Sequence, residues 1–386
     1  MAPVSRRDMQ SDAIEIARVL LVVGLVCLHY FSFPNETTPP TDGFDPLHHP
    51  LATFVNSFVQ FFFFSSVPLL STISGWLFFT APTPATTFRR MRGKVRSLLL
   101  PLISWNALYV AIAFLWFTVQ PDSPILKEIG GVDLQQPHAS NLVNAVFGVT
   151  RLPIGVQFWF IHDLFLSTMV SPVLLLALRR APVIVGLGLA AVWLSGWDLV
   201  IFFRTDVLLF FYLGGLLRRY GVDRPTVGWT TTKIILVCYL AMIGLRTAAP
   251  LVADPAPWLE VATKLMRFVG VIVCWGLCLR FAKARFGPRL ARYGGFAFFL
   301  HAIHYPLIVV VKLLLWDAIP AETDGWMIAQ YFATICTTTL LAVLAGWGLF
   351  RVAPGVYAFL AGGRVFYQSA PRASKPPLPT EGLPIS

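Results

Sequence analysis

The sequence carries little charge for its length. Only 13% of its 386 residues are charged and 56% are hydrophobic, whereas about 25% of an average soluble protein is charged. Most of the surface therefore cannot face water. Because apolar runs of about 20 residues, long enough to cross a bilayer, recur along the chain, the sequence predicts a polytopic integral membrane protein and excludes a soluble globular domain.

Several patterns typical of soluble enzymes are missing. The chain has no Walker A phosphate loop, no GxGxxG nucleotide fingerprint and no GxSxG nucleophile elbow. Its five cysteines lie in apolar runs at spacings that match no zinc motif, so neither a metal site nor a disulfide framework is predicted. No small-residue cleavage site follows Arg6 and Arg7, and we expect the first apolar run to be retained as a span.

The apolar runs predict an all-α fold, a membrane bundle of about ten transmembrane helices. One membrane domain is expected over residues 1–363, followed by a disordered, proline-rich cytoplasmic tail over residues 364–386. The predicted spans are 13–33, 54–80, 97–118, 156–178, 182–197, 202–218, 232–250, 260–282, 294–316 and 326–350.

Acidic residues are scarce, 19 against 30 lysines and arginines, which leaves a net charge of +11. The basic residues gather in alternate loops, such as 89–96, 218–224 and 280–292, and acidic residues occupy the loops between them. The positive-inside rule then predicts that both termini are cytoplasmic. The same rule explains the net positive charge without nucleic-acid binding, and we expect membrane lipids to be the partners of the basic loops.

The first predicted span contains three ionisable residues, which are costly inside a membrane and therefore candidates for function. Arg18 and His29 are eleven residues apart, which on a helix is about 16 Å along one face. Glu15 precedes Arg18 by three residues and can pair with it. We interpret these three as candidate catalytic residues, with His29 suited to general-base work. The alternative is that Arg18 reaches lipid headgroups and His29 lies at the outer interface.

The fourth predicted span begins with QFWFIHDLFL. Asp163 is a further candidate catalytic residue because a carboxylate can orient a histidine; alternatively, it caps a helix or pairs with Arg204. Trp159 and His162 are candidates for a substrate pathway at the outer end of this span.

The ninth predicted span contains His301 and His304, three residues apart and on one face. Two histidines in apolar surroundings indicate a polar substrate pathway. A metal would need further ligands, which the spacing does not supply.

A dense basic stretch enters the third predicted span. Arg92, Lys94 and Arg96 are candidates for binding a phosphorylated cytosolic co-substrate. The alternative is ordinary anchoring to lipid phosphates.

These segments, in this order, resemble the acyltransferase-3 family of membrane O-acyltransferases. The resemblance covers residues 13 to about 312, and its most specific part is the Arg18-x10-His29 pattern preceded by Glu15. The chain departs from the family where Phe299 replaces the usual tyrosine and where His301 and His304 compete for one family position; Pro306 favours His304. The similar segments are SGWLFF (74–79), KVRSLLLPLISW (94–105), FWFIHDL (158–164), FFYLGGLLRR (210–219) and the ninth span.

The resemblance implies an enzyme that transfers an acyl group, commonly acetyl from acetyl-CoA, to a hydroxyl of a cell-surface or exported polysaccharide or a lipid-linked saccharide. Acyl-CoA is then a co-substrate on the cytoplasmic side, with no tightly bound cofactor. His29 acts as base or carries the acyl group itself, and Arg18 positions the donor or counters the developing charge. The resemblance also implies a bacterial inner membrane. The alternative function is a transporter or flippase of a glycan or lipid-linked substrate.

Overall fold

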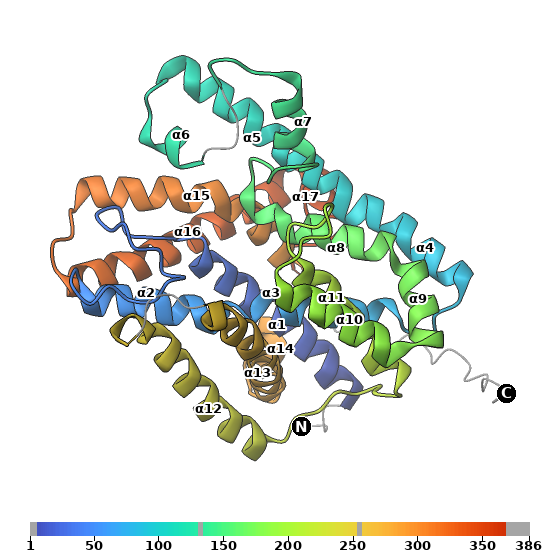
Figure 1. Ribbon diagram of the computed structural model, residues 1–386. Helices are drawn as coiled ribbons and strands as arrows, with labels where there is room; N and C mark the ends of the chain where they lie inside the picture. Colours follow the sequence, from blue (N-terminus) through green and yellow to red (C-terminus); the bar gives the residue numbers. More distant parts are fainter. Residues whose placement is uncertain (1–5, 130–133, 253–256, 368–386) are drawn as a thin grey trace.

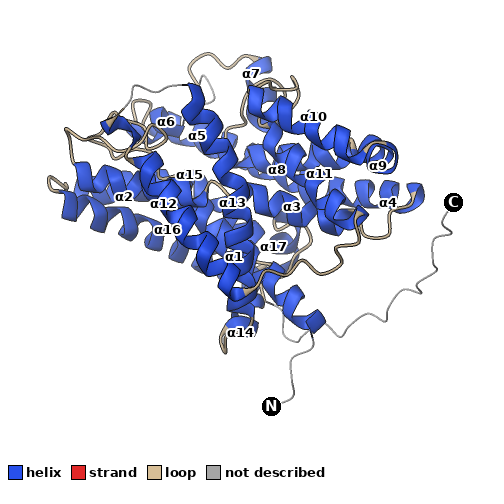
Figure 2. Cartoon of the chain, turned by 60° about the horizontal axis from the view of Figure 1, so that its bottom comes forward, coloured by secondary structure: helices blue, strands red, loops and turns tan. Residues whose placement is uncertain are grey.

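The computed structural model describes residues 6–129, 134–252 and 257–367, and within these ranges all regular structure is helical (Figure 2). The longer helices are α1 (Arg6–Leu28), α2 (Pro50–Phe63), α3 (Ser66–Phe78), α4 (Pro84–Lys94), α5 (Leu100–Val119), α8 (Trp159–Met169), α9 (Ser171–Arg180), α10 (Pro182–Ser195), α11 (Thr205–Arg219), α12 (Trp229–Thr247), α13 (Pro257–Ala282), α15 (Ala297–Ala318) and α16 (Asp324–Val352). Short helices α6 (Pro124–Ile129), α7 (Ala139–Phe147), α14 (Gly287–Ala291) and α17 (Pro354–Leu360) join them, with single turns η1 (Val95–Leu99), η2 (Val156–Phe158) and η3 (Ala249–Leu251).

An all-helical membrane bundle is confirmed, because within the described ranges six helices are long and apolar enough to cross a bilayer. A seventh span results if α8 and α9, which meet at an angle of 59°, are counted together. The remaining predicted spans are also helical, but α10 and α11 are short and the first half of α1 carries charge. The count of about ten spans and the cytoplasmic placement of both termini stay predictions.

Helix α1 lies at the centre of the bundle (Figure 1). It contacts α2, α3, α13, α14, α15 and α16. Its side chains Ile16, Ala17 and Val26 are completely buried, so α1 runs through the protein interior rather than along the lipid-facing surface, although the Arg18 side chain stays partly exposed. This placement brings both ends of α1 against helices from the other end of the sequence.

The most extensive helix contact joins α3 and α11. Glycines allow it: a Cβ at Gly75 would overlap the carbonyl oxygen of Phe211, and a Cβ at Gly214 would overlap that of Thr72. Small residues at such crossings let two backbones approach closely inside a membrane. The crossing holds the loop before α11 beside the functional site described below.

The chain continues in ordered contact beyond residue 363, where the tail was expected to start. Phe366 is buried, and its ring lies 4.9 Å from that of Phe296 and 5.9 Å from that of Tyr357. These aromatic contacts hold residues 364–367 against the bundle. The rest of the predicted tail, residues 368–386, lies outside the described residues.

Candidate active site

His29 lies in the turn that ends α1, where its backbone N–H still bonds the carbonyl of Leu25. Its side chain is buried, and its Nδ1 lies 2.8 Å from the same carbonyl oxygen. Because a carbonyl only accepts, Nδ1 must carry the proton. The neutral imidazole then presents Nε2 as its basic nitrogen, as a general base requires.

A second histidine supports the same tautomer. Nε2 of His304, on α15, lies 3.2 Å from Nδ1 of His29. Nδ1 of His304 lies 3.1 Å from the carbonyl oxygen of Leu300 and therefore donates to it, which leaves Nε2 of His304 as an acceptor for His29. The proton on Nδ1 of His29 is thus shared between Leu25 and His304. A histidine held in this way is oriented by its partner, as in other nucleophile-activating sites.

A proline near these histidines gives α15 its bend. Tyr305 has non-helical backbone angles and Pro306 has no N–H, so the carbonyl of Ala302 loses its helical partner. Tyr109 and Gln157 replace that partner: each donates to the Ala302 oxygen at 2.6 Å. Gln157 also donates to the Tyr305 oxygen at 2.8 Å. These side chains from α5 and η2 hold the bend, and with it His301 and His304.

His301 has a different environment from His304. It is 3% exposed, and among the described residues neither of its ring nitrogens makes a hydrogen bond of good geometry, although the side chain interacts with the backbone of Gln157. An unpaired buried polar group costs free energy, which a bound ligand with hydrogen-bonding groups can recover. Its ring lies 5.6 Å from that of His304. The two histidines that the sequence left as alternatives therefore lie on one bend, with His304 beside His29 and His301 unpaired.

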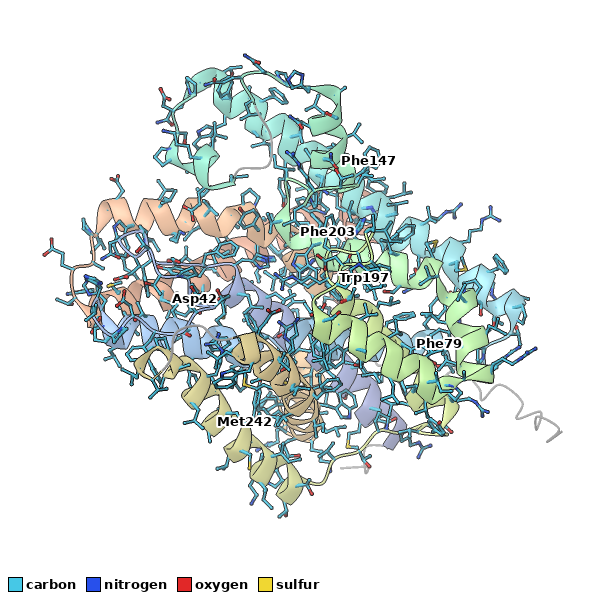
Figure 3. The ribbon with its side chains drawn as sticks, viewed as in Figure 1. Asp42, Phe79, Phe147, Trp197, Phe203 and Met242 are labelled. Carbon is cyan, nitrogen blue, oxygen red and sulfur yellow. The ribbon has the colours of Figure 1, made fainter. Side chains whose placement is uncertain are left out.

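His29 and His301 line a cavity of about 450 Å³. Gln157, Trp159, Arg204 and Arg267 also line it. A second cavity, of about 640 Å³, shares Arg204, Asp206 and Arg267 with the first and continues past Asp42 and Trp193. Figure 3 shows Phe203, from the first cavity, and Asp42, from the second, both in the central part of the molecule. His29 and His301 thus lie in the wall of a cleft that also contains charged side chains and is large enough for a saccharide.

The cleft contains charged residues that the sequence reasoning missed. Arg267 of α13 pairs with Asp206 of α11 at 2.7 Å, and both side chains are largely buried. Arg204 lies over the Trp159 ring, 4.6 Å from its centroid, and interacts electrostatically with His29. Arg267 stands in the middle of an apolar run, so the rule that flagged Arg18 would have found it.

Trp159 lines the cleft, as expected for a substrate pathway, whereas His162 and Asp163 do not line it. The Asp163 carboxylate accepts from the backbone N–H of Phe203 at 3.1 Å and from that of Arg204 at 2.8 Å. His162 lies 3.0 Å from Asp163. The structure therefore places Asp163 in contact with one histidine, His162, and with the backbone that leads into α11, where it positions Arg204.

Glu15 and Arg18 form the expected pair, with Oε1 and Nη1 2.6 Å apart. Arg18 lies eleven residues before His29, which is in the turn that ends the same helix, about 16 Å away along its axis. A Cβ at Gly294 would overlap Glu15, so a glycine is required for the chain before α15 to pass so closely. At this separation no single small group can contact both Arg18 and His29.

The three basic candidates before α5 have different surroundings. Lys94 is partly buried and interacts electrostatically with Arg18, Arg90 and Arg364. Arg92 and Arg96 are exposed, because residues two positions apart on a helix face nearly opposite directions. The structure thus places Lys94 within electrostatic range of Arg18 and leaves the other two on the surface. Among the described residues no group of three or more His, Cys, Asp or Glu side chains is placed to hold a metal ion.

A membrane helix bundle in which one buried histidine is oriented by another in the wall of a cleft is an arrangement suited to an enzyme that uses a general base. A sequence model of the family described as "Acyltransferase domain" matches residues 11–347. The chain therefore belongs to the acyltransferase-3 family, as the resemblance implied, and is an acyltransferase. Membership favours acyl transfer over the transporter or flippase alternative.

A curated relative extends the comparison. The chain is 25% identical over 366 residues to "Succinoglycan biosynthesis protein ExoH" of Rhizobium meliloti (strain 1021), which covers 92% of this chain and 92% of the relative. No solved structure matches the chain.

Proposed function

We propose that this acyltransferase transfers an acyl group, acetyl as the simplest case, from acyl-CoA to a hydroxyl of an exported polysaccharide or of its lipid-linked precursor, in the bacterial inner membrane. Family membership supports acyl transfer, and the printed name of the relative supports a polysaccharide acceptor. The observation that carries the proposal is the His29–His304 contact, because it leaves Nε2 of His29 as the base beside a cleft of saccharide size.

In the proposed reaction the acceptor enters through the cleft lined by Trp159 and Arg204. Its hydroxyl gives a proton to Nε2 of His29 while its oxygen forms a bond to the thioester carbonyl carbon. The tetrahedral intermediate then collapses, the C–S bond breaks, and the CoA sulfur leaves and takes the proton back from His29. The products are an O-acyl ester and free CoA. His304 stabilises the imidazolium of His29 by accepting from Nδ1.

The donor occupies the other end of α1 in this proposal. Arg18 and Lys94 hold the phosphates of CoA, and the flexible pantetheine arm carries the thioester toward His29. Arg18 therefore positions the donor rather than countering charge at the carbonyl, because about 16 Å of helix separates it from His29. Arg92 and Arg96, which are exposed, bind the headgroups of anionic membrane lipids.

The test measures transfer of radiolabelled acetyl from acetyl-CoA to polysaccharide in membranes that contain equal amounts of each variant. We expect His29→Ala to lower the rate by about 100-fold or more, the usual contribution of a general base. The matched control is His48→Ala, which removes an exposed histidine that pairs with Asp45 outside the cleft and should leave the rate unchanged. Full activity of His29→Ala would remove His29 from the chemistry.

A further inference from the structure

Three cationic side chains from distant parts of the chain meet at the Arg18 end of α1. They are Arg18 itself, Lys94 at the end of α4, and Arg364 in the segment after α17. Lys94 interacts electrostatically with Arg364 and Arg18, and Arg364 interacts with Arg18. Glu15, which already pairs with Arg18, offsets part of this charge.

The backbone after α17 places Arg364 in this group. Gly362 and Gly363 have φ values of +64° and +81°, which glycine adopts without strain, and they turn the chain back toward α4. Nη1 of Arg364 donates to the carbonyl of Ala361 at 3.0 Å and lies 3.5 Å from that of Ser97, three residues after Lys94. These contacts use one of the guanidinium nitrogens.

The Arg364 guanidinium also lies over the ring of Phe298, 4.6 Å from its centroid. Phe298 precedes His304 by six residues on α15, about 9 Å along that helix. Arg18 likewise precedes His29 on α1. The helices α1 and α15 therefore run parallel, each from the three cations toward the contact between His29 and His304.

Among the charged side chains that act on Lys94 and Arg364, cations outnumber the one carboxylate, that of Glu15. Burial, and then the charge of Arg18, lower the pKa of Arg364 to about 10, although Glu15 acts in the opposite direction. The electrostatic neighbours of Lys94 are themselves cations: Arg364, Arg18 and Arg90. Like charges held together under partial burial favour binding of an anion, and guanidinium groups bind phosphate through paired hydrogen bonds.

We propose that Arg364 joins Lys94 and Arg18 in a phosphate-binding site for the acyl-CoA donor, an inference that rests on the function proposed above. The segment after α17 then completes the donor site, and the pantetheine arm extends between α1 and α15 toward His29. Anionic lipids also carry phosphate, so the experiment separates the two sources.

The experiment compares two donors, acetyl-CoA and S-acetylpantetheine, which has the same thioester but no phosphate. The full-length protein is assayed in neutral detergent as wild type, Arg364→Gln and Arg364→Lys. We expect Arg364→Gln to raise the KM for acetyl-CoA by about 10-fold or more, because hydrogen bonds to a charged group are lost, and to leave the KM for S-acetylpantetheine unchanged. Arg364→Lys should recover part of the affinity.

The matched control is Arg292→Gln. Arg292 donates to the hydroxyl of Tyr367 at 2.7 Å, so this change removes a cation that contacts the same segment but not the cationic group. It should leave the KM for both donors unchanged. Thermal unfolding of each variant is measured in parallel.

Several outcomes would overturn the inference. Equal rises in KM for both donors, with a lower unfolding temperature, would show that Arg364 only supports the fold. An unchanged KM for acetyl-CoA in Arg364→Gln, with activity that changes only in phosphatidylglycerol vesicles and not in phosphatidylcholine, would assign the site to lipid. If the wild type neither binds CoA nor uses either donor, the proposed function fails together with the inference. If the wild type uses acetyl-CoA and Arg364→Gln has the same KM for it, the inference alone fails.

Discussion

Replacing His304 tests whether a second histidine orients His29, the proposed general base. His304→Leu removes the acceptor that lies 3.2 Å from Nδ1 of His29. Leu25 still accepts from the same nitrogen at 2.8 Å, so the tautomer of His29 survives. What is lost is one hydrogen bond to the imidazolium that forms during transfer, worth about 1.5–3 kcal/mol for a charged donor. The expected effect is a fall in kcat of about 10- to 150-fold.

The variant His304→Gln provides the comparison, because its side-chain oxygen can accept from His29 where leucine cannot. We expect Gln to keep most of the activity and both variants to keep the KM values of donor and acceptor. Leucine strands no buried polar group, since Nδ1 of His29 still donates to Leu25 and the carbonyl of Leu300 still accepts within the helix. The assay is steady-state transfer from radiolabelled acetyl-CoA by purified protein, with thermal unfolding measured in parallel.

Two results would refute this reasoning. Equal losses of kcat in the Leu and Gln variants would mean that acceptance by residue 304 is unimportant. A loss confined to KM would place His304 in substrate binding instead.

Two further predictions address the cleft and the fold. His301→Phe removes two buried nitrogens that make no hydrogen bond of good geometry. We therefore expect the protein without substrate to gain about 1–3 kcal/mol of stability and the KM for the acceptor to rise. A lower unfolding temperature with an unchanged KM would contradict this. Gly214→Ala places a Cβ against the backbone of Thr72 and should lower the free energy of unfolding by about 1–3 kcal/mol. Its control, Gly188→Ala, meets no atom within 4 Å and should be neutral or stabilising; equal effects of the two changes would exclude close packing as the cause.

Much of the helical architecture could be predicted because hydropathy is a local property. Each predicted span contains a helix in the structure, including the long apolar helices α5 and α16. The predicted fourth span, however, is bent by 59° between α8 and α9. The break has a local signal that the span prediction did not use: Pro172 lies in the first turn of α9 and disfavours helical backbone in the residue before it.

The candidate site was predictable residue by residue but not as an arrangement. The cost of ionisable groups in a membrane flagged His29, His301 and His304 individually. That His29 meets His304, across 275 residues of sequence, depends on α1 and α15 packing side by side. The same rule was not applied to Arg267, and its pairing with Asp206 was missed.

The segment that begins at Arg364 shows the limit of composition as a guide. Its polar, proline-rich character predicted a tail, yet Phe366 is buried against α15 and α16, and Arg364 lies with Lys94 and Arg18. Two glycines with positive φ and one aromatic anchor decide this, and neither has a distinctive compositional signal.

The sequence by itself determined the membrane class, the helical fold and the family, because run length, hydropathy and motif order are all read along the chain. Only the tertiary structure decided which histidine supports His29, which basic residues gather at the other end of α1, and that Asp163 binds backbone beside the cleft. These outcomes depend on contacts between helices far apart in sequence, and burial and hydrogen bonding assign roles only after those helices have packed.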